Sequence, residues 1–289
     1  MSAFTVVHPS LSELRWVTFQ RKGREKLLLG AGSVPLPPDT LRMQPLGPQI
    51  HQAPPFLEAV RTLLQQADTR KHILILPDAW MKSFMLEVES LPRRNRELHD
   101  LVGWHLKKSF MVKPEDVRFA WSALGNGHQT DAPHRLVVTF AFERLAAAFE
   151  EVYHAQRVRL GLITSSFWAI CHAVPMEGSW ALLVLEGDLW SLGLFQGDQP
   201  RLFRQRRLPP GRPEGISEEL ERTFAMLGAA PARLILYQNP EVLPLSPALM
   251  QMEIYTSSAR GEVRSKAQER PPFWDPEGEI YCGGLHALP

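Results

Sequence analysis

The order of elements along the sequence repeats, and this repeat constrains the fold more than any other feature. In the first part, hydrophobic patterning predicts three strands, a helix and a buried apolar strand, at 4–7, 13–19, 25–36, 54–67 and 71–78. The same order returns downstream, at 179–186, 189–196, 200–210, about 215–227 and 232–240. We therefore interpret the chain as a diverged duplication of one α/β unit.

A segment with its own pattern lies between these two parts. It predicts a strand at 82–91, a helix at 94–110, strands at 117–124 and 135–142, and the start of another helix at 145. Strand, helix, strand, strand and helix make a compact α+β unit. The predicted domains are a first half at 1–175, with an insertion at about 82–160, and a second half at 176–289.

Charge and cysteine usage exclude several classes of function. The formal net charge of the 289-residue chain is +1, which gives no field that would gather nucleic acid or an anionic membrane. Its two cysteines, Cys171 and Cys282, form no paired spacing, as is usual in a reducing compartment. We find no signal peptide and no apolar run long enough for a membrane span. We expect a cytoplasmic protein that meets the membrane only through a partner.

Other motifs in the sequence support no chemistry of their own. Gly30 and Gly32 lack the third glycine and the following helix of a dinucleotide fingerprint. His99 and His105 are six residues apart on one helix and point only partly the same way, so we expect no metal site. The arginines between 201 and 212 are too few, and too rarely interleaved with aromatic residues, to predict nucleic-acid binding.

Several stretches resemble the PilM family of the actin-like ATPase superfamily, in which FtsA and the cytoplasmic part of GspL are relatives. They are "GAGSVPLPP", "ILILPDAWMKSFMLEVESLP", "LVGWHLKKSF" followed by "PEDVRFAW", and the ending "GGLHAL". The resemblance implies an α/β, actin-like (ribonuclease H-like) duplicated two-domain fold with a small α+β insertion in the first half.

The family resemblance also implies a Mg-ATP site between the halves, and this sequence departs from it. Each of the family's two phosphate loops has an Asp followed by a Gly two residues on, and a Gly-Gly pair approaches the adenosine. The corresponding residues here are His8 and Ser10, Val184 and Glu186, and Gln238 and Asn239. A shifted register offers Glu186 as the acid but does not restore the spacing. We therefore expect no cofactor and no catalytic residue. The alternative is an active actin-like ATP-binding protein or ATPase with unusual phosphate loops.

The resemblance implies a partner as well. It predicts a non-catalytic scaffold of a type IV pilus or type II secretion-like machine, in contact with other pilus or secretion subunits. The scaffold would bind the cytoplasmic N-terminal tail of a PilN-like inner-membrane protein between the first half and the insertion. The expected binding residues are Phe84, Leu101, Trp104, His105 and Lys108. Trp104 lies at the edge of the apolar helix stripe, where it either covers the core or anchors the tail.

Overall fold

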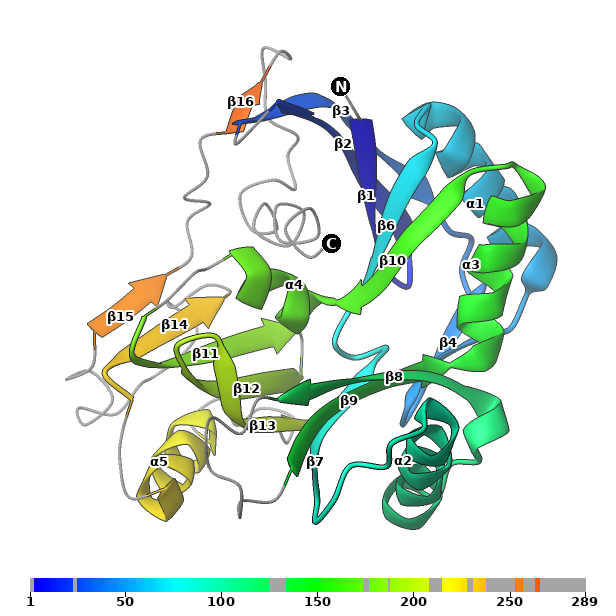
Figure 1. The fold of residues 1–289 in the computed structure, drawn as a ribbon. Helices are drawn as coiled ribbons and strands as arrows, with labels where there is room; N and C mark the ends of the chain where they lie inside the picture. Colours follow the sequence, from blue (N-terminus) through cyan, green and yellow to red (C-terminus); the bar gives the residue numbers. More distant parts are fainter. Residues whose placement is uncertain are drawn as a thin grey trace.

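The computed structural model describes residues 3–22, 25–124, 134–173, 177–186, 188–207, 215–227, 231–237, 253–256 and 263–265. These residues form two lobes, each built on a mixed β-sheet, and an inserted unit that packs beside the junction of the lobes (Figure 1). Within the described residues, none of the helices has both the length and the apolar character needed to span a membrane.

The first lobe contains the N-terminal repeat. Its elements are β1 (Ala3–Pro9), β2 (Glu13–Lys22), β3 (Glu25–Pro35), the hairpin β4 (Leu41–Gln44) and β5 (Gly47–Ile50), α1 (Ala53–Ala67) and β6 (Lys71–Leu76). The helix α1 buries Phe56, Val60 and Leu63 because they recur at helical spacing. The ring of Phe56 meets Phe149 edge to face, with centroids 5.1 Å apart, so α1 packs against α3 (Glu143–Ala155).

The inserted unit is a three-stranded sheet covered by one helix. Its elements are β7 (Lys82–Val88), α2 (Asn95–Phe110), a short 3₁₀ turn η1 (Pro114–Asp116), β8 (Val117–Leu124) and β9 (His134–Phe142), with strand order β7-β9-β8. The chain then forms α3 (Glu143–Ala155) and β10 (Arg159–Ser165), which returns to the first sheet parallel to β6. The sequence interpretation missed β10.

The second lobe repeats the first. Its elements are α4 (Ser166–Ala173), β11 (Ser179–Glu186), β12 (Leu189–Gln196), β13 (Gln199–Arg207), α5 (Gly215–Leu227), β14 (Arg233–Tyr237) and β15 (Glu253–Thr256). In each lobe three antiparallel strands are followed by a helix and a strand parallel to the first of the three. The predicted duplicated α/β fold with an α+β insertion is therefore confirmed. One further strand, β16 (Val263–Ser265), crosses back and pairs with β3 of the first lobe.

The lobes share a hydrophobic core. Val6, Phe19 and Ile73 of the first sheet belong to the same buried cluster as Leu182 and Ile235 of the second. The helix α4 lies between the two sheets and contributes Phe167 and Ile170 to this cluster. The ends of β1, β6 and β11 and the start of α4 are thus held together at the junction, where the sequence predicts a degenerate nucleotide site.

Candidate functional site

The turn between β1 and β2 is closed by the side chain of Ser10. The backbone N–H groups of Ser12 and Glu13 point to the Ser10 hydroxyl oxygen, at N–O distances of 3.3 Å and 3.1 Å. The backbone N–H of Ser10 itself donates to the carbonyl of Glu13, at 2.7 Å, and Pro9 has no N–H to offer. In a glycine-rich phosphate loop, such backbone N–H groups point toward the phosphate. In this turn they donate to acceptors within the turn instead.

The end of β11 brings a carboxylate into the junction. Glu186 accepts a hydrogen bond from the backbone N–H of Asp78, which follows β6 in the first lobe. The Oδ1 atom of Asp78 accepts the backbone N–H of Phe167, at 3.0 Å, in the first turn of α4. The side chain of Glu186 therefore contacts the backbone of a second acidic residue, 108 residues away in sequence, where the lobes join.

Their surroundings favour the protonated form of this pair. Burial, followed by the negative charge of Asp78, raises the pKa of Glu186 to about 8. Burial also raises the pKa of Asp78. Lys82 is the nearby cation. Its pKa is lowered by its own burial and next by the charge of Arg207, while its positive charge lowers the pKa of Asp78.

Gln205 of β13 completes the junction. Its side-chain amide donates to the backbone carbonyls of Asp78, at 2.9 Å, and Met81, at 3.3 Å, and lies 3.4 Å from the Ser191 hydroxyl. On the opposite side, the His8 ring nitrogen Nε2 is 3.4 Å from the hydroxyl oxygen of Ser166. The connection between β6 and β7 is thus fixed to the second lobe by side chains of the protein itself.

These residues do not fit Mg-ATP. Val184 is apolar and buried, so it offers no metal ligand at the position of the second loop's acid. Glu186 places a carboxylate where a phosphate requires a glycine backbone. Among the described residues, no group of three or more His, Cys, Asp or Glu side chains is arranged to hold a metal ion. Gln238 and Asn239 lie outside the described residues.

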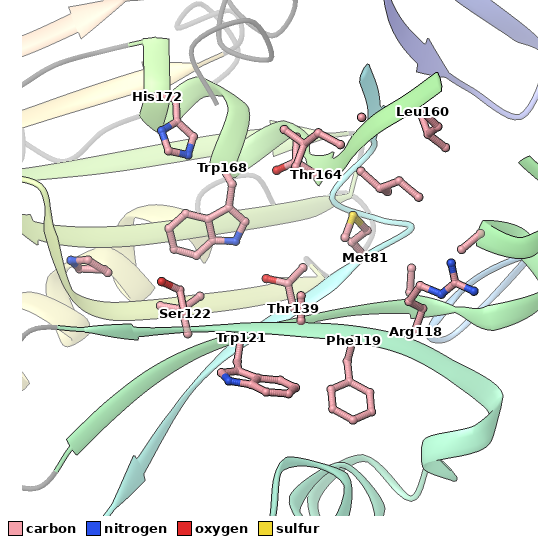
Figure 2. Close-up of a pocket in the computed structure, with 18 of the residues that line it drawn as sticks. Met81, Arg118, Phe119, Trp121, Ser122, Thr139, Leu160, Thr164, Trp168 and His172 are labelled. Atoms are coloured by element: carbon pink, nitrogen blue, oxygen red, sulfur yellow. The ribbon is translucent and has the colours of Figure 1, made fainter. Parts of the chain in front are cut away.

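A second feature is a cavity of about 650 Å³ between the inserted unit and both lobes, where Asp198 and Pro200 of the second lobe also reach it (Figure 2). Its walls come from β8 and β9 on one side and from β10 and α4 on the other. The lining residues used below are Arg118, Ser122, Thr139, Leu160, Thr164 and Trp168. The strands β8 and β10 are the edge strands of their sheets among the strands that the structure describes.

Polar contacts hold the walls of this cavity. The indole N–H of Trp168 donates to the hydroxyl of Ser83, at 3.0 Å, and that hydroxyl lies 2.9 Å from the Thr139 hydroxyl. In Figure 2, Ser122 and Thr139 point from the inserted sheet toward Trp168. Arg118, at one side, is bound by two carboxylates, Glu143 and Glu150. Two acids on one cation leave this end of the cavity net negative.

No protein-family model matches the sequence, and no curated protein matches it. Solved structures do match. A chain of a PilM-PilN type IV pilus biogenesis complex aligns with a TM-score of 0.74 at 16% identity, over 99% of this chain and 98% of that one. The cytoplasmic domain of EpsL, an inner-membrane component of the type II secretion system of Vibrio cholerae, aligns with a TM-score of 0.54 at 13% identity, over 98% and 94%. A Bacteroides thetaiotaomicron protein with an actin-like ATPase fold gives 0.51 at 8% identity, over 90% and 92%.

The fold is actin-like. The resemblance to PilM and to the cytoplasmic domain of a secretion component, predicted from short sequence stretches, is confirmed at the level of the fold.

On this actin-like fold, the residues predicted to bind a partner separate into two places. Trp104 is 52% exposed, its ring centroid lies 4.7 Å from the Lys108 ammonium, and the His105 ring packs against it. Phe84 faces the other way and packs on Phe110, with ring centroids 5.0 Å apart.

Leu101 is half-buried and packs against the core between α2 and its sheet. None of these five residues is among those that line the cavity. Their role in partner binding stays a prediction.

Sequence reasoning singled out His8, Ser10 and Glu186 but missed Asp78, Gln205 and the cavity. Asp78 carries a signal, because it is a charged residue two positions after the apolar run Ile73–Leu76. Gln205 and Trp168 carry none. They meet Asp78 and Ser83 only after the second lobe has packed on the first.

Proposed function

We propose that this chain is a non-catalytic scaffold of a type IV pilus or type II secretion-like machine. It binds the cytoplasmic N-terminal tail of a PilN-like inner-membrane protein, and through that partner it lies at the cytoplasmic face of the membrane, beside other pilus or secretion subunits. The observation that carries the proposal is the cavity between the edges of β8 and β10. The fold shared with a chain of a PilM-PilN complex supports it.

Two sheet edges that face one cavity suit an extended peptide. The backbone N–H and C=O groups along an edge strand lack a partner on one side, and an added strand supplies one. Alternate side chains of such a peptide point to opposite sides. One set meets the apolar wall of β10 and Trp168, and the other meets the small residues of β8 and β9, such as Ser122 and Thr139. The net negative end near Arg118 favours a positively charged group in the tail.

The junction supports a non-catalytic role. Catalysis by a nucleotide-dependent protein requires preorganised donors and a metal site for the phosphates. The Ser10 hydroxyl occupies the donors of the first turn, and Glu186 brings negative charge to the second. Each charge-assisted hydrogen bond to a phosphate contributes about 1.5–3 kcal/mol to the free energy of nucleotide binding. The loss of several such bonds therefore removes tight binding.

The experiment compares two neighbouring substitutions on β8. Ser122 lines the cavity, whereas the adjacent Ala123 is also exposed but is not among the lining residues. We expect Ser122→Phe to fill the cavity and to weaken binding of a synthetic tail peptide by about 2 kcal/mol or more, as loss of a central contact does. Ala123→Phe is expected to bind as the wild type does. The peptide is the N-terminal cytoplasmic segment of the PilN-like protein from the same genome, measured by titration calorimetry.

Trp104→Ala distinguishes the two possible locations of the tail. If this variant loses the peptide while Ser122→Phe retains it, the tail binds on the exposed surface of α2 instead. If neither substitution changes the affinity, both locations of the tail are wrong. If the wild type does not bind the peptide, the proposed function is wrong.

A further inference from the structure

The junction of the lobes holds two carboxyl groups near one half-buried cation, Lys82. Asp78 comes from the first lobe and Glu186 from the second, and the N–H of Asp78 donates to Glu186. Lys82 supplies one positive charge to this group. The second oxygen of Asp78, Oδ2, is buried and accepts no hydrogen bond of good geometry among the described residues, although the hydroxyls of Ser165 and Ser191 are close enough to lower the pKa of Asp78. A charged carboxylate oxygen in that position is costly, whereas a proton on the pair relieves the cost.

The other charged and titratable groups around the pair are already engaged. Arg207 of β13 binds Asp188, with N–O distances of 2.9 Å and 3.0 Å. His8 of β1 approaches Ser166, which hydrogen-bonds to Glu186. The thiol of Cys171 on α4 is neutral, because burial and then the charge of Asp78 raise its pKa. Among the described residues around the pair, Lys82 is therefore the cation that remains to balance Asp78 and Glu186. It balances one negative charge, and a proton neutralises the other carboxyl group.

We propose that one of the two carboxyl groups, those of Asp78 and Glu186, keeps a proton at the junction and that the pair thereby forms a latch that joins the two lobes. With the proton in place, the pair carries one negative charge, which Lys82 balances. When the proton leaves, two like charges from opposite lobes face each other at low local dielectric, and their repulsion weakens the contact between the lobes. The latch occupies the position at which the family resemblance expects a bound ligand to bridge the halves.

The direction of the pH effect follows from linkage. The pKa of Glu186 is about 8 in the folded protein, above its ordinary value of 4.5. The folded state therefore binds more protons than the unfolded state, and stability falls as the pH rises through 8. For one group with these values, the ratio of folded to unfolded protein decreases about tenfold between pH 7 and pH 9. The histidines titrate below this range in the unfolded chain and contribute little to it.

The test measures urea unfolding of the full chain at pH 7 and pH 9, for the wild type and for Glu186→Gln. The glutamine keeps the shape and the acceptor but cannot ionise. We expect the tenfold loss in the wild type and a much smaller change in Glu186→Gln. Glu177→Gln is the matched control, because Glu177 is exposed just before β11. It is expected to lose stability as the wild type does. Cys171 and Lys82 titrate in all three proteins and cancel in the comparison.

Infrared spectroscopy provides a measurement that needs no variant. The wild type at pH 7 is expected to show the carbonyl band of a protonated carboxylic acid, which disappears by about pH 9. The band should be missing at pH 7 in both Glu186→Gln and Asp78→Asn, since a single remaining carboxylate pairs with Lys82. Parallel loss of stability in the wild type and Glu186→Gln, or a wild-type spectrum at pH 7 without this band, overturns the proposal.

Discussion

At the scale of single residues, Gly193 decides how closely the helix between the lobes can approach the second sheet. A Cβ atom at this position of β12 would lie 2.5 Å from Cζ of Phe167 and 2.6 Å from Cε2 of Phe195. Phe195 cannot turn aside freely, because its ring is stacked on Trp180 with centroids 4.1 Å apart. The glycine is required by close packing against α4 and not by a special backbone angle.

We expect Gly193→Ala to lower the free energy of unfolding by about 1–3 kcal/mol, since even one added methyl overfills this contact. Gly215→Ala is the control, because a Cβ at Gly215 meets nothing within 4 Å. Urea unfolding measures both. If the smaller side chain of Phe167→Leu does not recover part of the loss in the double variant, the proposed contact is not the cause.

At the scale of elements, α2 shows which part of a helix the core uses. Leu98, Val102 and Leu106 are buried against the inserted sheet, as their helical spacing predicts. Trp104 lies off this stripe and is 52% exposed. The sequence left open whether this indole covers the core, and the structure places it at the surface, beside Lys108.

We therefore expect the two neighbouring positions to behave differently. Leu106→Ala should cost about 2–5 kcal/mol of stability, because it leaves a cavity at a fully buried position. Trp104→Ala should change stability by less than about 0.5 kcal/mol, as a surface substitution does. Thermal unfolding followed by circular dichroism measures both. Early unfolding of the Trp104 variant would show that its ring contributes to the core.

At the scale of the whole molecule, the duplication provides two equivalent hairpins, β1–β2 and β11–β12, which the family resemblance aligns with two phosphate loops. Ser10 closes the first, and Glu186 turns the second into part of the contact between the lobes. Side chains of the protein itself join its two halves.

We expect millimolar Mg-ATP or Mg-ADP to leave the melting temperature unchanged. A ligand at a hundredfold excess over its Kd adds about 2.7 kcal/mol of stability and raises the transition by several degrees. Differential scanning fluorimetry, with a nucleotide-binding protein of the same fold as positive control, makes the comparison. A rise of several degrees with Mg-ATP would favour the alternative of an active nucleotide-binding protein.

The sequence predicted much of the fold because each element of the repeat has a local pattern of apolar residues. Apolar periodicity identified both sets of three strands, helix and strand, and the inserted unit between them. It missed β10, whose residues are mostly half-buried and include Gly161, because an edge strand needs less apolar character. It also gave no sign that β16 returns to the first sheet, since this pairing joins Val263 to Lys26 across most of the chain.

In the candidate site, only residues that align with the phosphate-loop motif of the actin-like family were named from the sequence. The assignment of His8, Ser10, Val184 and Glu186 as degenerate nucleotide positions came from such an alignment, and it stays a prediction. The partners of Glu186 could not be identified from the sequence, because Asp78 reaches it only after both lobes have folded. The cavity was equally hidden. Its walls, β8 and β10, belong to different sheets, and no sequence pattern records how two sheets are oriented.

The position of Trp168 gives the protein an optical probe of the cavity. Its indole lines the cavity and is hydrogen-bonded to Ser83, and Trp121 is a second tryptophan of the lining, whereas Trp80, Trp180 and Trp190 are buried elsewhere, with at most 3% exposure. The fluorescence of an indole depends on the water around it, so the emission of Trp168 responds to whatever displaces solvent there. Acrylamide quenching separates this signal from that of the exposed Trp104. Occupancy of the cavity can thus be followed in the unlabelled protein.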